Sequence, residues 1–434
     1  MQEQQFKSRS RRGHRRRGRG GRQWENRPGG GGSGGSGHQG GFQQGNSQRQ
    51  EDVPYGPQQR IDVAGILEMQ PDNQGWLRNV QNNFVPEDTD PYLPMGLTRS
   101  ANLRPGSEVV GAAERVRGRW TVVDIKTVDG MTAEQAATLP LFKQLVSVDP
   151  VERFVLEGGV AVDGDNGATT NMRILDLITP VGKGQRGLIT ASPRSGKTIL
   201  LQQMANRISS AYPDVHLIVL LVDERPEEAT HFRRTIKGEV IASTNDEPAD
   251  RHCRITELTI ERAKRLVERG KDVVIVMDSL TRLGRAYNVT IRNSGRTLSG
   301  GVDSRTLEKP KAFFGSARKV EGGGSLTILA TALIETGSRM DEVIFEEFKG
   351  TGNMELVLSR ELAERRIYPA IDINKSGTRK EELLLPSDVF RKVVLLRRVL
   401  SQMHPVEAMQ LLVAKMRETR ANDQFLASFD VRNS

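Results

Sequence analysis

The sequence is poor in cysteine, in aromatic residues and in long apolar runs. Cys253 is the single cysteine among 434 residues, which excludes an intrachain disulfide and a multi-cysteine zinc site and fits a reducing compartment. The apolar run 215–222 is far shorter than the roughly 20 residues of a membrane span. The polar N-terminal end shows no hydrophobic signal-peptide region. We therefore expect a soluble cytoplasmic protein without a membrane partner.

The formal net charge of +9 comes from the beginning of the chain. Residues 1–50 hold ten Arg and one Lys against two Glu, so they carry +9 and the remainder sums to about zero. Arg, Gly, Gln and Ser dominate this segment, and its few apolar groups cannot offset chain entropy. Residues 1–55 are therefore predicted to be a disordered tail. It would either hold RNA phosphates, with Phe6 and Trp24 stacking on bases, or only aid solubility.

Residues 56–130 carry short stretches of alternating apolar and polar residues, separated by Gly, Pro, Asn and Asp. This pattern predicts a small antiparallel β barrel. Aromatic residues are only 5% of the chain, yet Trp76 and Trp120 both fall in these strands beside a basic residue, such as Arg78, and Phe84 follows shortly after. Aromatic faces next to arginine suit stacking on single-stranded bases. Tryptophans in the barrel core would give the same pattern.

The rest of the chain alternates between strands and helices. Residues 131–180 are interpreted as a connector, with a short helix over 132–146 and a strand over 173–180. From residue 181 to 434, continuous apolar strands alternate with amphipathic helices, and the end is helical from about residue 386. Apolar strands separated by helices predict an α/β domain with a mainly parallel sheet covered by helices on both faces.

The stretch ASPRSGKT at 191–198 is a candidate phosphate-binding loop. A predicted strand precedes it and a predicted helix follows, so backbone N–H groups and the helix dipole would face an anion. Lys197 would reach the β- and γ-phosphates, and the Thr198 hydroxyl would hold Mg²⁺. Ala191 stands where the general motif has glycine. The predicted nucleotide contacts are Arg194, Ser195, Gly196, Lys197, Thr198 and Ile199.

Two carboxylates follow neighbouring predicted strands. Asp278 ends the strand VVIVMD, a position from which a carboxylate acts on Mg²⁺ directly or through water. Glu224 ends the strand LIVLLVDE, where it could orient and polarise the attacking water. Either acid alone could simply cap a helix. Together with the phosphate loop, they predict a site that hydrolyses a nucleoside triphosphate.

Basic residues further along the chain could assist. Arg282, Arg366 and Arg379 are candidates for an arginine finger that stabilises charge on the transferred phosphoryl group. Arg379 could instead pair with a neighbouring glutamate. The segments 294–303 and 335–342 each place one Arg among Gly and Ser, which suits either mobile loops that touch a nucleic-acid backbone or ordinary surface turns.

Longer strings identify a resemblance. GQRGLITASPRSGKTILLQ, LLVDERPEEAT, MDSLTRLGRAYN, GGVDSRTLEKPKAFFGSARKVEGGGSLTILATALIETGSRMDEVIFEEFKGTGNMEL and YPAIDINKSGTRKEEL closely resemble the Rho family of transcription termination factors. The resemblance runs from about residue 60 almost to the C-terminus and is densest over 182–385. Loops of this family also begin with alanine, so Ala191 agrees with the family.

The resemblance implies both architecture and activity. It implies a RecA-type P-loop ATPase core preceded by an OB-fold barrel, in a ring-shaped homohexamer. The ring would use ATP and Mg²⁺ to pull nascent RNA through its pore, and would release the transcript from RNA polymerase, where elongation factors are further partners. A rotary ATP synthase subunit is the nearest enzyme alternative. An RNA-binding protein that has lost its ATPase is the alternative from another class.

The resemblance also implies roles for single residues of the barrel. Trp76, Phe84 and Trp120 match the family's aromatic pocket for pyrimidines, with Arg78 beside them. Gln74 stands where the family usually has an aromatic residue.

In the core, the resemblance implies that the arginine finger given to the neighbouring subunit is Arg379, with Arg366 close by, and that Tyr368 packs on adenine. Arg194 stands where lysine is common, so a planar fork replaces a point charge. The segments 294–303 and 335–342 match the two pore loops, and Arg296 and Arg339 occupy places often held by lysine.

Overall fold

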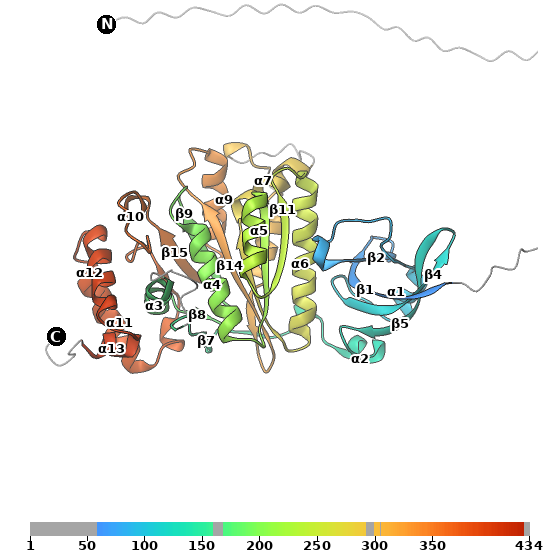
Figure 1. Ribbon diagram of the computed structural model, residues 1–434, viewed down its shortest axis with the longest axis horizontal. Helices are drawn as coiled ribbons and strands as arrows, with labels where there is room; N and C mark the ends of the chain where they lie inside the picture. The colour runs from blue at the N-terminus through green and yellow to red at the C-terminus, as the bar shows by residue number, and fades with distance from the viewer. Residues whose placement is uncertain (1–58, 159–167, 292–298, 304, 429–434) are drawn as a thin grey trace, which may run out of the picture. The chain divides into compact units, whose positions relative to one another are not determined.

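The computed structural model describes residues 59–158, 168–291, 299–303 and 305–428 (Figure 1). The predicted tail and Arg296 lie outside these residues. Within them no helix is long and apolar enough to cross a membrane. The predicted architecture, a small barrel followed by an α/β domain with a mainly parallel sheet, is confirmed.

The N-terminal part is a closed barrel with strand order β1-β2-β3-β5-β4. Its interior holds small and medium apolar side chains such as Val63, Leu67, Leu93 and Val122. β1 is antiparallel to both β2 and β4, and the register places Glu68 opposite Trp76. The elements of this part are β1 (Arg60–Met69), β2 (Gly75–Arg78), β3 (Tyr92–Leu93), α1 (Met95–Ser100), β4 (Glu108–Val116), β5 (Arg119–Val128) and α2 (Ala133–Thr138).

The core sheet runs in the order β11-β10-β12-β14-β9-β15-β16. All its neighbours pair in parallel except β15 and β16, and β13 adds an antiparallel strand at β14. The strands are β9 (Arg186–Ala191), β10 (His216–Glu224), β11 (Glu239–Thr244), β12 (Asp272–Asp278), β13 (Arg318–Val320), β14 (Ser325–Leu333), β15 (Met354–Leu358) and β16 (Gly377–Thr378). The short strands are β6 (Ser147–Val148), β7 (Arg153–Phe154) and β8 (Val181–Gly182).

Helices cover both faces of this sheet, which explains the continuous apolar strands. In β10, Leu217 and Val219 face one apolar cluster, and Ile218 and Leu220 face the other. The first face is covered by α3 (Ala168–Ile178), α4 (Lys197–Ala211), α5 (Pro226–Thr235) and the C-terminal helices α10 (Arg360–Glu364), α11 (Ser387–Leu400), α12 (Pro405–Arg417) and α13 (Asn422–Ala427). The second face is covered by α6 (Ala249–Glu268), α7 (Leu280–Thr290), α8 (Glu308–Gly315) and α9 (Arg339–Lys349).

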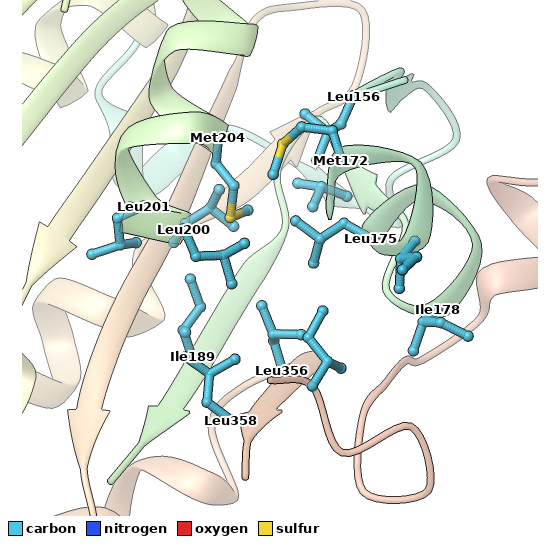
Figure 2. Close-up of a cluster of buried hydrophobic side chains, with 14 of the residues drawn as sticks. Leu156, Met172, Leu175, Ile178, Ile189, Leu200, Leu201, Met204, Leu356 and Leu358 are labelled. Atoms are coloured by element: carbon cyan, nitrogen blue, oxygen red, sulfur yellow. The ribbon is translucent and has the colours of Figure 1, made fainter. Parts of the chain in front are cut away.

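Two predicted elements of the connector were wrong. The segment read as a strand over 173–180 is mostly helix α3, and the helix predicted over 132–146 ends at Thr138. In α3 every residue from 171 to 178 is buried, including the polar Arg173 and Asp176, so the helix is covered on all sides. Figure 2 shows Met172 and Leu175 of α3 pointing toward α4 and the strands β9 and β15, and Ile178 belongs to the same apolar cluster.

Candidate active site and RNA-binding surface

The phosphate loop joins β9 to α4. Ala191 is the last residue of β9, pairs with both β14 and β15, and is fully buried. Its φ is not positive, so a side chain is tolerated where the general motif has glycine. Gly196, just before α4, has φ 88°, and an added Cβ would lie 3.3 Å from a ring carbon of Tyr368. The positive φ therefore favours glycine at 196, and a larger residue would also need the Tyr368 ring to shift by a few tenths of an ångström.

A cavity of about 750 Å³ opens beside this loop. Ile199 and Tyr368 reach it from different elements, and their side chains are 59% and 41% exposed, so both offer apolar surface to a bound ring. Arg366 lies two residues before Tyr368, is exposed and also lines the cavity. The structure brings together the predicted nucleotide contacts Arg194, Ser195, Gly196, Lys197, Thr198, Ile199 and Tyr368 in this single cavity.

Lys197 connects the loop to both predicted carboxylates. Its Nζ donates to both carboxylate oxygens of Asp278 and lies 3.4 Å from Oε1 of Glu224. A second cation, Arg282, lies 3.4 Å from the same glutamate oxygen. The hydroxyl of Thr331 donates to Asp278 Oδ1 at 2.7 Å and fixes the orientation of that carboxylate. Thr331 could not be predicted from the sequence, because a threonine inside an apolar strand gives no local signal of its partner.

Glu224 has the chemistry of a general base. Burial, and then the nearby Asp278 carboxylate, raise its pKa to about 7, although Lys197 and Arg282 act in the opposite direction. A carboxylate with a pKa near the working pH is well suited to accept a proton from an attacking water. Neither Glu224 nor Asp278 lines the nucleotide cavity itself. Both lie next to Nζ of Lys197, which does line it.

The residues present fit a Mg²⁺ ion. Mg²⁺ in NTPases is bound by one or two protein oxygens and by phosphate and water oxygens. Asp278 and the Thr198 hydroxyl supply such protein oxygens, and the latter now donates to Glu228 at 3.2 Å. Among the described residues no group of three or more His, Cys, Asp or Glu side chains could hold a metal by itself. The donor set therefore suits an ion that arrives with the nucleotide.

Arg379 lies outside the nucleotide cavity of its own chain. It is exposed and lines a separate polar cavity of about 450 Å³ with Asn353, Ser376 and Arg397. The expected alternative, a pairing with Glu381 or its neighbour, is not seen: in the described part of the chain, Glu381 faces Arg397 at 3.7 Å and the Arg379 guanidinium has no carboxylate partner.

The two segments predicted to be pore loops contact each other, as far as the structure describes them. A Cβ at Gly300 would lie 2.9 Å from the carbonyl oxygen of Arg339, so the segment at 299–301 packs closely on the start of α9. Arg339 is the first residue of that helix and is exposed, so only the first part of the loop predicted at 335–342 is irregular.

Aromatic residues form a cradle on the barrel. The rings of Trp76 and Tyr92 meet edge to face, with centroids 5.4 Å apart. The exposed guanidinium of Arg119 lies 5.0 Å from the first ring and 5.3 Å from the second. Tyr92 donates to the side-chain oxygen of Gln74 at 2.5 Å. Trp120, on β5, is half-buried and has Arg115 6.0 Å from its ring.

The prediction that Phe84 offers a face to RNA was wrong. Its side chain is fully buried and belongs to the apolar cluster that includes helix α6 of the core. Tyr92 takes the place beside Trp76 that was expected for Phe84. Tyr92 could not be predicted from the sequence, because it lies in a two-residue strand between prolines, where no alternation is visible. Only the pairing of β2 with β3 brings it to Trp76.

Arg78 is also placed differently from the expectation. It is 7% exposed, and its guanidinium donates to Glu68 at 2.6 Å and to Asp90 at 2.5 Å. Its Cζ lies 5.5 Å from the Trp76 ring. Two carboxylates thus neutralise Arg78, so it holds Trp76 in place and does not offer a free charge to phosphate.

Replacing Trp76 should weaken RNA binding, whereas replacing Phe84 should lower the stability of the fold. For Trp76→Ala we expect RNA affinity to fall by about 1–3 kcal/mol, since a stacking platform is lost, with little change in the thermal melt. For Phe84→Ala we expect the free energy of unfolding to fall by about 3–5 kcal/mol from the cavity left behind. RNA affinity per folded molecule should then stay constant. Filter binding and thermal melting of both variants measure these effects. Weaker RNA binding with an unchanged melt in Phe84→Ala would show that Phe84 contacts RNA after all.

The pKa of Glu224 predicts two opposite pH dependences. Because the folded-state pKa lies near 7 and the unfolded value near 4.5, the native state binds more protons between these values, and stability falls as pH rises through 7. Activity needs the ionised form, so kcat/KM for ATP should rise over the same range. Glu224→Gln should lower kcat by about 10²–10⁴ and reduce the loss of stability as pH rises through 7, whereas Glu227→Gln, an exposed neighbour, should change neither. A thermal melt of Glu224→Gln that keeps the full pH dependence of the wild type would contradict this assignment.

Both the barrel and the core match known protein families. Residues 63–134 match the RNA-binding domain of Rho termination factor, and residues 171–378 match the nucleotide-binding domain of the ATP synthase alpha/beta family. The transcription termination factor Rho of Pseudomonas aeruginosa is 49% identical over 375 residues, which cover 85% of this chain and 88% of that protein. The Rho of Haemophilus influenzae is 50% identical over 367 residues, covering 83% of this chain and 86% of its own length.

Solved structures share the fold of the core. An ATPase from a bacterial type III secretion system superposes with a TM-score of 0.54 at 22% identity, covering 65% of this chain and 86% of its own. An ATP synthase subunit from Nanoarcheaum equitans gives a TM-score of 0.51 at 17% identity, covering 59% of this chain and 63% of its own. At such identities these likenesses support the α/β fold of the core alone, and the nucleotide-binding domain is supported by the family match over residues 171–378.

Proposed function

The chain belongs to the Rho family of transcription termination factors, and we propose that it is an RNA-dependent ATPase that moves along nascent RNA and terminates transcription. The observation that carries this proposal is the presence, on one chain, of an aromatic cradle on a barrel and a phosphate loop facing two carboxylates. The first suits single-stranded RNA, and the second suits ATP hydrolysis.

The steps of hydrolysis follow from the site. The phosphate loop holds the β- and γ-phosphates, and Lys197 moves from Asp278 towards them when nucleotide binds. Mg²⁺ neutralises charge on the phosphate oxygens when bound, and Asp278 and Thr198 are the side chains that would hold it. Glu224, ionised, orients a water for in-line attack and accepts its proton. Arg366 of the same chain lines the nucleotide cavity and would approach the bound nucleotide.

The catalytic site is completed by a neighbouring subunit. Arg379 lines no part of its own chain's nucleotide cavity and has no carboxylate partner among the residues that the structure describes. We propose that it reaches the nucleotide of the adjacent subunit in a homohexamer. Arg339, with Arg296, would contact RNA in the pore. On the barrel, Trp76 and Trp120 would stack on bases of pyrimidine-rich RNA.

The proposed partners are nascent RNA, RNA polymerase and its elongation factors, in the cytoplasm. A rotary ATP synthase subunit is a weaker second candidate, favoured by the matched nucleotide-binding model. The matched RNA-binding model and the partly exposed aromatic cradle count against it.

RNA-stimulated ATP hydrolysis distinguishes these functions. We expect poly(C) to raise ATP turnover severalfold, because RNA bound at the aromatic cradle and in the pore would stimulate hydrolysis in the ring. We also expect the assembled subunits to have the mass of a hexamer. Hydrolysis indifferent to RNA would favour the synthase-like alternative. RNA binding without hydrolysis would leave an RNA-binding protein that has lost its ATPase.

A further inference from the structure

Strand β10 contains one irregular residue, directly before Glu224. Asp223 has φ 57°, in the left-handed region, whereas the other residues of β10, all of which the structure describes, do not have a positive φ. The pairing with β11 shifts at this point: Val222 lies opposite Ser243 and Glu224 opposite Thr244, so no residue of β11 lies opposite Asp223. This extra residue makes a β-bulge, a feature that is rare between parallel strands and that changes the direction of a side chain.

Without the bulge, Glu224 would face the wrong side of the sheet. Odd-numbered residues of β10 up to Leu221 belong to the apolar cluster on the side of α4, and even-numbered residues up to Val222 belong to the cluster on the side of α6 and α7. A regular strand would continue this alternation, because successive side chains point to opposite faces. Asp223 would then face α4, and Glu224 would face α6 and α7, away from the phosphate loop.

The structure shows the opposite arrangement. Glu224 lies on the side of α4, where its Oε1 is 3.4 Å from Nζ of Lys197. The charge of Asp223 acts on the other side: burial lowers the pKa of His252 on α6, and the Asp223 carboxylate opposes this shift. The left-handed residue therefore exchanges the faces of the two acids.

The residue type at position 223 fits this conformation. Aspartate and asparagine are among the few residues other than glycine that adopt a positive φ readily, whereas β-branched residues do not. Among the residues that the structure describes, the Asp223 carboxylate forms no hydrogen bond or ion pair. Beyond the bulge the backbone is held again, since the carbonyl oxygen of Glu224 accepts from the N–H of Asn245 at 3.0 Å.

We propose that Asp223 is a positioning residue, whose left-handed backbone turns the Glu224 carboxylate towards Lys197 and the phosphate loop. This inference rests on the proposed nucleotide hydrolysis, in which Glu224 accepts a proton from the attacking water. Because the role belongs to the backbone conformation, glycine or asparagine can fill it, and the charge of the aspartate is not needed. A residue that favours extended backbone would let β10 continue regularly and direct Glu224 to α6 and α7.

ATP turnover of variants at position 223 tests this role, with the full chain, Mg²⁺ and poly(C). Asp223→Gly and Asp223→Asn allow the positive φ without the charge, and should keep most of the wild-type kcat. Asp223→Val should lower kcat by about 10²–10⁴, the loss of a general base. Its KM for ATP should change little, because Glu224 does not line the nucleotide cavity. Asn102→Val, which replaces an exposed residue of the barrel with φ 46°, is the matched control and should keep wild-type turnover.

A double variant separates positioning from general damage to the fold. If Asp223 acts through Glu224, adding Asp223→Val to Glu224→Gln should lower kcat no further, since the group that is misdirected is already inactive. Thermal melting and RNA filter binding show whether each variant is folded. Asp223→Ala is the second test of the conformation, because alanine strains the left-handed backbone but brings in only one methyl group. Its kcat should lie between those of Asp223→Gly and Asp223→Val.

Three results would overturn the proposal. An equal loss of kcat in Asp223→Gly and Asp223→Val would show that the carboxylate matters and the backbone conformation does not. Wild-type turnover in a folded Asp223→Val, or in Asp223→Ala if the valine variant does not fold, would show that the bulge is not needed. A further loss of kcat in the double variant would show that position 223 acts on something other than Glu224. A wild-type chain that hydrolyses no ATP would instead refute the proposed function.

Discussion

For Lys197→Ala we expect ATP turnover to fall by on the order of a thousandfold or more, while RNA still binds. Lys197 is the side chain that joins the phosphate loop to both Asp278 and Glu224. Its loss removes the charge that stabilises the transferred phosphoryl group, and it also removes the cation between two buried carboxylates. RNA binding survives because Trp76 and Tyr92 belong to the barrel and form no part of the nucleotide cavity.

Steady-state ATPase and filter binding measure the two effects side by side. Lys143→Ala, an exposed lysine, is the matched control and should keep wild-type turnover. With Lys197 gone, the repulsion between Glu224 and Asp278 is no longer offset, so the nucleotide-free variant should be less stable at pH 8 than at pH 6 by a larger margin than the wild type. Turnover that persists in Lys197→Ala would show that the phosphate loop has been assigned to the wrong residues.

The second large effect concerns Arg379. For Arg379→Ala we expect kcat to fall by about 10³–10⁵, the effect of removing an arginine finger. ATP affinity of the isolated subunit should barely change, because Arg379 lines a different cavity from the phosphate loop. Lys380→Ala, the adjacent exposed residue that pairs with Asp149, is the control and should keep its turnover.

Mixed rings show whether Arg379 acts on a neighbour. A ring assembled from Lys197→Ala and Arg379→Ala subunits regains an intact site wherever the phosphate loop of the second meets the arginine of the first. We expect turnover to return on mixing two inactive proteins. If Arg379 acted on its own chain, the mixture would stay inactive, since each subunit would carry a defective site.

Much of the core site could be predicted because its residues lie at the ends of strongly patterned elements. The continuous apolar strands β10 and β12 end at Glu224 and Asp278, and the loop after β9 ends at the start of α4. In a parallel sheet these ends lie at one edge, so three local signals are enough to bring the groups together. The hydrogen bonds of Lys197 to Asp278 show that they do meet.

The barrel surface could be predicted only in part. A short alternating pattern marks a strand, but it does not say which side chain is covered by a distant helix. Phe84 and Trp76 look alike in sequence, yet contact with the core buries Phe84 fully and leaves Trp76 partly exposed. Tyr92 becomes part of the cradle through β-pairing alone. Arg78 looks like a free cation until Glu68 and Asp90, from other elements, neutralise it.

The sequence by itself determined the element types of the core, the phosphate loop with its two carboxylates, and the family, because each depends on residues close together in the chain. Only the tertiary structure decided which aromatic residues are partly exposed, that α3 is a helix on the core, and that Arg379 lies away from its own nucleotide cavity. These depend on burial and on side chains up to about 250 residues apart, such as Arg173 and Asn422. Long-range packing sets exposure and charge pairing, and no local pattern carries that information.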